Sequence, residues 1–154
     1  MPPTSTLKIA EPKLNALYSY WLSKCGNRPM PARPDIDPVE IPDLLPSLLL
    51  MDTAEELANF RFRLFGTELC KQFGEDRTGM NIGDFRVRID NQEQVFAGDW
   101  NVYAERRPDY FPDRTLSVEK DFIRYSRVLL PLSPDGATVN MILGGIEFHR
   151  QRLE

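Results

Sequence analysis

The segment Asn59–Phe85, NFRFRLFGTELCKQFGEDRTGMNIGDF, decides the fold because it encodes a strand, a turn and a helix in close succession. Phe60, Phe62 and Leu64 alternate with arginine at 61 and 63, and this period of two predicts a β-strand with one apolar face. Gly66 follows and breaks the strand.

A short helix follows this strand. Thr67 is a suitable N-cap, Leu69 and Phe73 stand at helical spacing, and Gly74 supplies a stop, so the helix has about two turns. Gly79 ends an acidic loop and is free to adopt positive φ. A strand, a glycine turn and a short helix that folds back over the sheet predict a concave space between the helix and the sheet.

Before this segment, an amphipathic helix is predicted from Lys13 to Cys25, within an N-terminal helical region 13–28, after a disordered lead-in of residues 1–12. An apolar stripe on this helix contains tryptophan and tyrosine, so another surface must cover it, either the sheet of the same chain or a second subunit. We favour a homodimer, with the stripe as the dimer or partner interface. Its members are Leu14, Leu17, Tyr18, Trp21 and Leu22.

Residues 29–46 are rich in proline, but they contain too many apolar side chains for a free linker. We interpret them as a strap on the surface of the domain. Within the strap, Asp37, Pro38 and Glu40 have the spacing of a helix start, and Pro42 limits that helix to about one turn.

The rest of the chain predicts an α+β fold. A first strand is expected at 47–52, a helix at 90–105, a turn at 110–113 and three antiparallel strands at 115–119, 123–132 and 138–148. With the strand at 60–65 this makes a five-stranded antiparallel sheet with short helices on one face. The last strand is apolar on both sides, so we expect both faces of the sheet to be covered. Gly144 and Gly145 within it indicate a bulge or a close approach by a neighbour.

Four short motifs give the chain a family resemblance. They are Tyr18-Ser19-Tyr20-Trp21, IDPVEIPDLLP at 36–46, RFRLFGT at 61–67, and Thr78-Gly79. Together these motifs resemble those of a bacterial family of single-domain PAS-like proteins. The resemblance covers roughly residues 14–149 and implies a PAS-like fold and a sensor-like role, but it implies no chemistry. We place the PAS-like domain itself at residues 29–149, after the N-terminal helical region, and a tail at 150–154.

Composition excludes several classes of protein. The net charge of −4 gives no general attraction to nucleic acid or to an anionic membrane. The apolar runs are far too short to span a bilayer, and the N-terminus lacks the apolar core of a signal peptide, so we expect a cytoplasmic protein. Cys25 and Cys70 stand in unrelated contexts, which argues against a disulfide framework or a zinc site.

Two pairs of side chains could serve acid and base catalysis. Glu119 and Asp121 share one side of a strand end, and Glu147 and His149 share one side of the last strand. We interpret both pairs as solvated charges at strand ends and predict that the chain is not an enzyme. The alternatives are a small cofactor-free enzyme on a curved-sheet α+β cone and a purely structural dimerisation adaptor.

The cofactor of such a domain is left unknown. His149 stands five residues from the last residue of the sequence, which is poorly placed for an axial haem ligand. Cys70 lies in Leu69-Cys70-Lys71-Gln72-Phe73, which lacks the Asn-Cys-Arg-Phe-Leu-Gln type of motif of flavin-binding light sensors. Both observations argue against haem and flavin, and Cys70 is interpreted as a buried structural residue. No metal site is predicted.

The remaining candidate site is a pocket between the helices and the sheet, which either holds a small apolar or amphipathic ligand or is filled by side chains. Its expected lining is Phe62, Leu64, Phe73, Phe85, Phe96, Trp100, Tyr103 and Tyr125. Arginines on the strands and loops suit capture of a carboxylate or phosphate, although exposure is their usual state. They are Arg61, Arg63, Arg86, Arg88, Arg124 and Arg127.

We therefore predict a sensory or regulatory module without its own output domain. It binds a small ligand, a protein partner or both, and it signals to a separate protein through the N-terminal helix.

Overall fold

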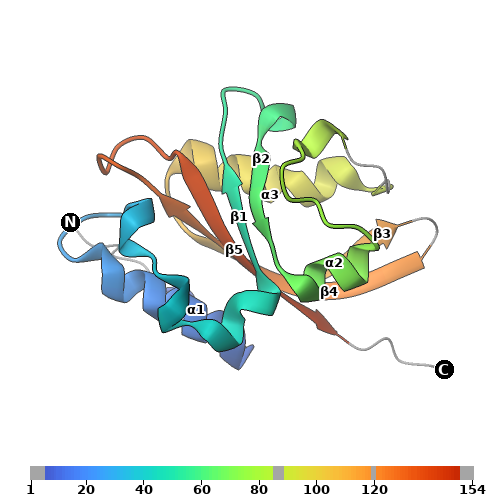
Figure 1. Ribbon diagram of the computed structural model, residues 1–154, viewed down its shortest axis with the longest axis horizontal. Coiled ribbons are helices and arrows are strands. Elements are labelled where there is room, and N and C mark those ends of the chain that lie inside the picture. The colour runs from blue at the N-terminus through green and yellow to red at the C-terminus, as the bar shows by residue number, and fades with distance from the viewer. Residues whose placement is uncertain (1–5, 85–88, 119–120, 150–154) are drawn as a thin grey trace.

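The computed structural model describes residues 6–84, 89–118 and 121–149. Within these residues, three α-helices and five β-strands form the fold (Figure 1). The helices are α1 (Pro12–Cys25), α2 (Thr67–Phe73) and α3 (Gln92–Glu105). The strands are β1 (Leu48–Asp52), β2 (Arg61–Phe65), β3 (Asp109–Val118), β4 (Asp121–Leu132) and β5 (Met141–His149). Short 3-10 turns lie at Arg33–Asp35, Pro38–Glu40, Pro42–Ser47, Leu57–Asn59 and Ile82–Asp84.

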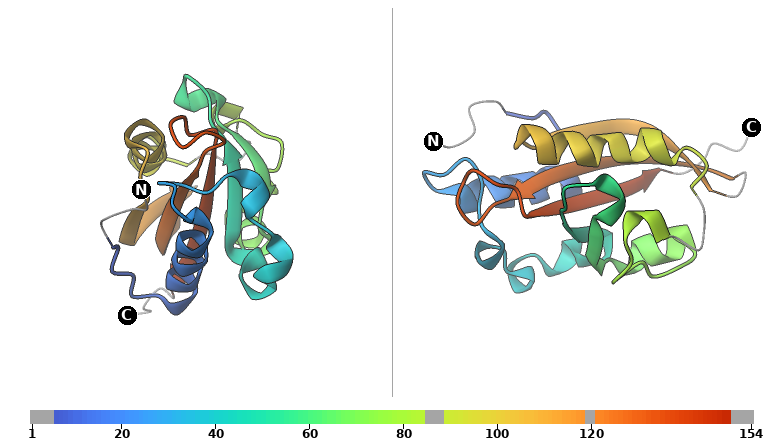
Figure 2. Two further views of the ribbon diagram at one scale, coloured as in Figure 1. Left: turned by 90° about the vertical axis from the view of Figure 1, so that its left-hand side faces the viewer. Right: turned by 90° about the horizontal axis from the view of Figure 1, so that it is seen from above.

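The strands form one antiparallel sheet in the order β2-β1-β5-β4-β3, which confirms the predicted five-stranded α+β fold. β4 and β5 are the long central pair, and they pair without interruption from Arg124 opposite His149 to Leu132 opposite Met141. Seen from above, α3 runs along β3 and β4 (Figure 2).

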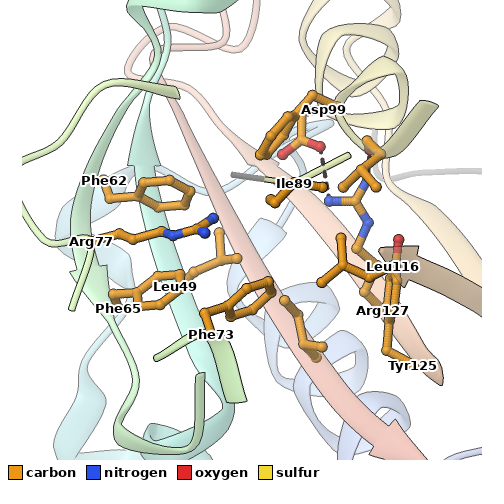
Figure 3. A pocket seen from close by; sticks show the side chains of 13 residues that line it. Leu49, Phe62, Phe65, Phe73, Arg77, Ile89, Asp99, Leu116, Tyr125 and Arg127 are labelled. Carbon is orange, nitrogen blue, oxygen red and sulfur yellow. Dashed lines mark hydrogen bonds and ion pairs between the residues drawn. The ribbon is translucent and has the colours of Figure 1, made fainter. Parts of the chain in front are cut away.

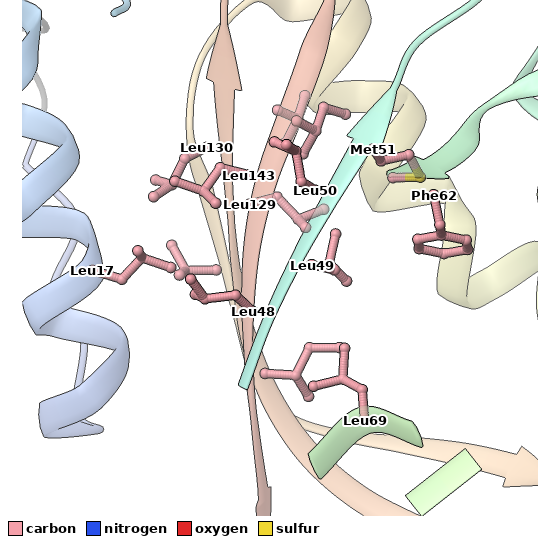
Figure 4. Packing of buried hydrophobic residues seen from close by; sticks show 14 of the residues in the cluster. Leu17, Leu48, Leu49, Leu50, Met51, Phe62, Leu69, Leu129, Leu130 and Leu143 are labelled. Atoms are coloured by element: carbon pink, nitrogen blue, oxygen red, sulfur yellow. The ribbon is translucent and has the colours of Figure 1, made fainter. Parts of the chain in front are cut away.

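Both faces of the sheet are covered, as the apolar last strand predicts. α1 lies on one side of the strands and α2 on the other (Figure 4). A Cβ atom added to Gly145 would lie 2.8 Å from Leu17 of α1, whereas one added to Gly144 would lie 2.9 Å from Leu49 on the opposite face. The two glycines therefore allow a close approach by neighbours from opposite sides, one of the two readings that the sequence left open.

The stripe of α1 packs against the sheet of its own chain. Leu14, Leu17, Tyr18 and Trp21 are at most 2% exposed, and Leu22 is half-buried. The sequence left open whether the chain's own sheet or a second subunit covers the stripe. In the structure, the chain's own sheet covers it. Preceding α1, Leu7 and Ile9 belong to the predicted lead-in and are partly buried against the core.

The strap folds as its helix-start pattern predicts. Asp37 accepts a hydrogen bond from the backbone N–H of Val39 at 3.0 Å and caps the 3-10 turn Pro38–Glu40. Ile36 and Leu44 are buried, so the strap is part of the folded domain.

Two local expectations are corrected. The predicted turn at 110–113 is part of β3, because a register shift between Phe111 and Arg114 accommodates Pro112 and Asp113 within the strand. The alternation in β2 is also interrupted, because Leu50 pairs with Leu64 while Met51 pairs with Phe62. This bulge breaks the single apolar face expected for β2.

Candidate functional site

A small apolar cavity lies between the sheet and the helices α2 and α3 (Figure 3). Its volume is about 30 Å³, roughly two waters, since a single water needs about 10–15 Å³. Its lining is Leu49, Phe62, Phe65, Phe73, Arg77, Ile89, Val95, Phe96, Asp99, Leu116, Tyr125, Arg127 and Ile146.

The structure brings four of the eight predicted pocket residues to this cavity, namely Phe62, Phe73, Phe96 and Tyr125. Phe65 replaces Leu64 because the bulge in β2 changes which side chains face inward. Phe85 lies outside the described residues.

Trp100 and Tyr103 lie elsewhere. Their rings pack with each other and with Phe60, and the ring of Tyr103 meets that of Phe60 edge-on at 5.4 Å. These three residues form an aromatic cluster between α3 and Phe60, and none of them lines the cavity.

A buried ion pair joins α3 to β4 at one wall of the cavity. Asp99 Oδ1 lies 2.8 Å from Arg127 Nη1, and the two side chains are at most 6% exposed. Arg127 Nη2 also donates to the carbonyl of Val95. Burial raises the pKa of Asp99, and the charge of Arg127 partly offsets this rise. The pair fixes α3 to the strand at the cost of desolvating two charges.

A second buried arginine, Arg77, enters the cavity from the loop after α2 (Figure 3). Its Nε lies 3.2 Å from Glu75 Oε1, and its guanidinium stacks over the ring of Phe73 at 4.7 Å. Burial lowers the pKa of Arg77, while Glu75 opposes that change. The apolar cavity thus has a guanidinium group on each of two opposite sides.

Sequence reasoning missed Arg77 and Asp99 as lining residues. Asp99 carried a usable signal, because Val95, Phe96, Asp99 and Val102 share the buried side of α3. A carboxylate on an apolar helix face requires a buried partner. Arg127 is among the arginines that the sequence offers for anion binding, but the structure buries it, whereas arginine is usually exposed.

The candidate acid-base residues lie away from the cavity. Glu119 is outside the described residues, and Asp121 is exposed at the start of β4. His149 Nε2 lies 2.7 Å from Ser126 Oγ and 3.6 Å from Glu11 Oε2. Both contacts use the same ring nitrogen, and Ser126 is 1% exposed, so this group is not arranged as a relay to an accessible nucleophile.

The same group ties the segment before α1 to the sheet. Tyr110 donates its hydroxyl hydrogen to Glu11 Oε1. Burial alone would raise the pKa of Glu11, but hydrogen bonds from Tyr110 and Ser126 bring it below its ordinary value. We interpret the group as a polar clamp on the start of α1.

Two further observations concern cofactors and membranes. Across residues 6–84, 89–118 and 121–149, no cluster of three or more His, Cys, Asp or Glu side chains is arranged to hold a metal ion. Within the same ranges, every helix is too short or too polar to cross a lipid bilayer.

The comparisons with known proteins agree with the architecture. A family model described as PAS domain matches residues 9–147. The structure of the PAS domain from Bordetella pertussis BvgS resembles this chain with a TM-score of 0.50 and 15% sequence identity, covering 90% of this chain and 89% of that one. At this identity the likeness shows the fold alone.

A second solved structure, that of an RNA-binding Light-Oxygen-Voltage receptor, has a TM-score of 0.42 and 18% identity, covering 70% of this chain and 32% of that one. This weaker likeness carries no argument. No curated protein matches the chain.

Proposed function

This chain belongs to the PAS domain family, and on that premise we propose that it is a sensory module whose cavity beside α3 binds a small ligand. The observation that supports the proposal is the cavity itself, an apolar space with buried Arg77 and the Arg127–Asp99 pair in its wall. Buried charges cost stability in a domain of this size, so their presence beside a cavity supports a binding role.

The sheet offers a physical route from the cavity to α1. Along β4, Arg127 and Leu129 face the cavity side, while Val128 faces Gly145 and α1. A ligand that shifts β4 therefore also shifts the surface on which α1 packs. If the docked and displaced positions of α1 differ in affinity for the ligand, ligand binding changes their populations.

An NMR titration tests the ligand site. We expect 1-hexanol or sodium hexanoate to cause saturable shifts in the amide signals of Leu49, Phe96 and Ile146. The absence of saturable shifts at these amides with either probe would contradict the proposal.

The small cavity favours one alternative, a module that acts only through protein contacts. About 30 Å³ is close to a fully packed core, and ligand pockets are usually far larger. In that case neither probe causes saturable shifts at the cavity, while removal of residues 1–11 still changes binding to a partner protein. The homodimer stays a prediction, which sedimentation of the purified chain at micromolar concentration tests.

A further inference from the structure

An open groove on the protein surface lies beside the apolar cavity. The groove has a volume of about 870 Å³ and lies between α3 and β3. Val95, Tyr125 and Arg127 line both the groove and the cavity, so these three side chains form the wall between them.

The two spaces differ in chemistry. The cavity is lined mainly by aliphatic and aromatic side chains. The groove is mixed: beside the aromatic residues Phe111, Phe122 and Tyr125, its lining has amide and hydroxyl residues that the cavity lacks. These are Asn91, Gln94, Asn101, Thr115 and Ser117. A molecule that crosses the shared wall therefore has an apolar end in the cavity and a polar end in the groove.

The charges around the groove favour an anionic polar end. The carboxylate of Asp113 accepts a hydrogen bond from Arg124 Nε at 3.1 Å, and Asp99 is paired with Arg127. Among the described residues, no carboxylate forms an ion pair with Arg114, which is exposed on β3. Within the described lining of the groove, Arg114 is thus the positive charge without an ion-pair partner.

Arg114 and Arg127 lie near the same ring. Their guanidinium carbons are 5.9 Å and 5.0 Å from the centroid of the Phe111 ring. Arg127 Nε is buried and has no hydrogen-bond acceptor among the described residues. A carboxylate oxygen is the acceptor that a guanidinium N–H binds most strongly.

We propose that the ligand is a small amphipathic carboxylate, with its apolar end in the cavity and its carboxylate in the groove near Arg114 and Arg127. This inference rests on the proposed function, because it specifies the ligand of the same site. The cavity accommodates only a few atoms before its walls must move, so the apolar end is a short chain or a small ring.

Three probes of equal chain length test the inference: sodium hexanoate, 1-hexanol and hexylammonium chloride. Each is titrated into the ¹⁵N-labelled full chain at one pH and ionic strength, and the amides of Leu49, Phe96 and Ile146 are followed. We expect hexanoate to bind at least tenfold more tightly than 1-hexanol, and hexylammonium to bind more weakly than 1-hexanol.

Variants test the role of the free charge. Arg114→Gln is expected to weaken hexanoate binding several-fold and to leave 1-hexanol binding unchanged. Arg61→Gln is the matched control and is expected to change neither. It also removes an exposed positive charge that has no ion pair among the described residues, on β2 at the opposite edge of the sheet.

The outcomes separate the two proposals. Equal affinity of hexanoate and 1-hexanol at the cavity amides, or an unchanged hexanoate affinity in Arg114→Gln, would overturn the carboxylate inference and leave the ligand site standing. No saturable shift at those amides with any probe would overturn both.

Discussion

The indole of Trp21 donates its Nε1–H to the backbone carbonyl of Pro131 at 2.9 Å. This hydrogen bond joins α1 to β4, and Trp21 is completely buried at the contact. α1 is therefore fixed to β4. Tyr125 and Arg127 of the same strand line the cavity on the opposite face of the sheet.

Replacement of this tryptophan should destabilise the domain. Trp21→Phe removes the indole donor and leaves a void in a buried contact, so we expect the free energy of unfolding to fall by about 2–3 kcal/mol. Urea denaturation followed by far-UV circular dichroism measures the change. Trp100→Phe, at a partly exposed position, is the control and should cost less than about 1.5 kcal/mol. Equal losses of unfolding free energy in the two variants would show that the Trp21 contact does not contribute more to stability than the Trp100 contact.

Gly145 permits the close packing of α1 on the sheet. In Gly145→Ala, the new methyl group would lie 2.8 Å from Leu17 Cδ2 and 3.1 Å from Leu14 Cδ2, so the Leu17 side chain, or α1 with it, must shift. We expect a loss of about 1–3 kcal/mol in unfolding free energy and faster hydrogen exchange in α1. Gly83→Ala meets only ordinary contacts at 3.5 Å and beyond and should change stability by at most about 0.5 kcal/mol. Unchanged exchange in α1 would refute the steric argument.

The buried pair of Asp99 and Arg127 should behave as a unit. Asp99→Leu leaves the arginine buried without its carboxylate and is expected to cost about 3–5 kcal/mol of unfolding free energy. The double variant Asp99→Leu/Arg127→Met removes both charges and should recover most of that loss. Urea denaturation of the wild type, both single variants and the double variant gives the coupling free energy between Asp99 and Arg127. A double variant as unstable as Asp99→Leu alone would contradict this prediction.

Stability should fall in alkaline solution partly because of Cys25. Burial raises the pKa of this thiol from 9.0 to about 11 in the folded chain. The folded state therefore holds the proton more tightly than the unfolded state, and the resulting stabilisation is complete below pH 9.0 and lost as the pH rises to about 11.

Removal of the Cys25 thiol should weaken the dependence of the unfolding free energy on pH. Urea denaturation at several pH values across this interval is expected to give a smaller slope of unfolding free energy against pH for Cys25→Ala than for the wild type. Burial also raises the pKa of the half-buried Cys70 thiol, but less than that of Cys25, so Cys70→Ala is the comparison and is expected to reduce the slope less than Cys25→Ala. An identical slope in Cys25→Ala and the wild type would show that Cys25 does not titrate between the two states.

The sequence was sufficient for the architecture because hydrophobic period and turn residues are local signals. The stripe from Leu14 to Trp21 and the doubly apolar β5 predicted a sheet covered on both faces. The residues that line the cavity were harder to predict from the sequence. The bulge that exchanges Leu64 for Phe65 depends on the register with β1, and the burial of Arg77 depends on a loop folding over the rings of Phe65 and Phe73. Both are tertiary effects with no local signal.

The central claim is that the cavity and α1 are coupled through the two central strands. Hydrogen exchange measured by mass spectrometry, with and without saturating sodium hexanoate, tests it most directly. We predict that the ligand changes exchange in α3, which borders the cavity, and also in α1 on the opposite face of the sheet. A change confined to α3 and the cavity strands, with exchange in α1 unaltered, would contradict the claim.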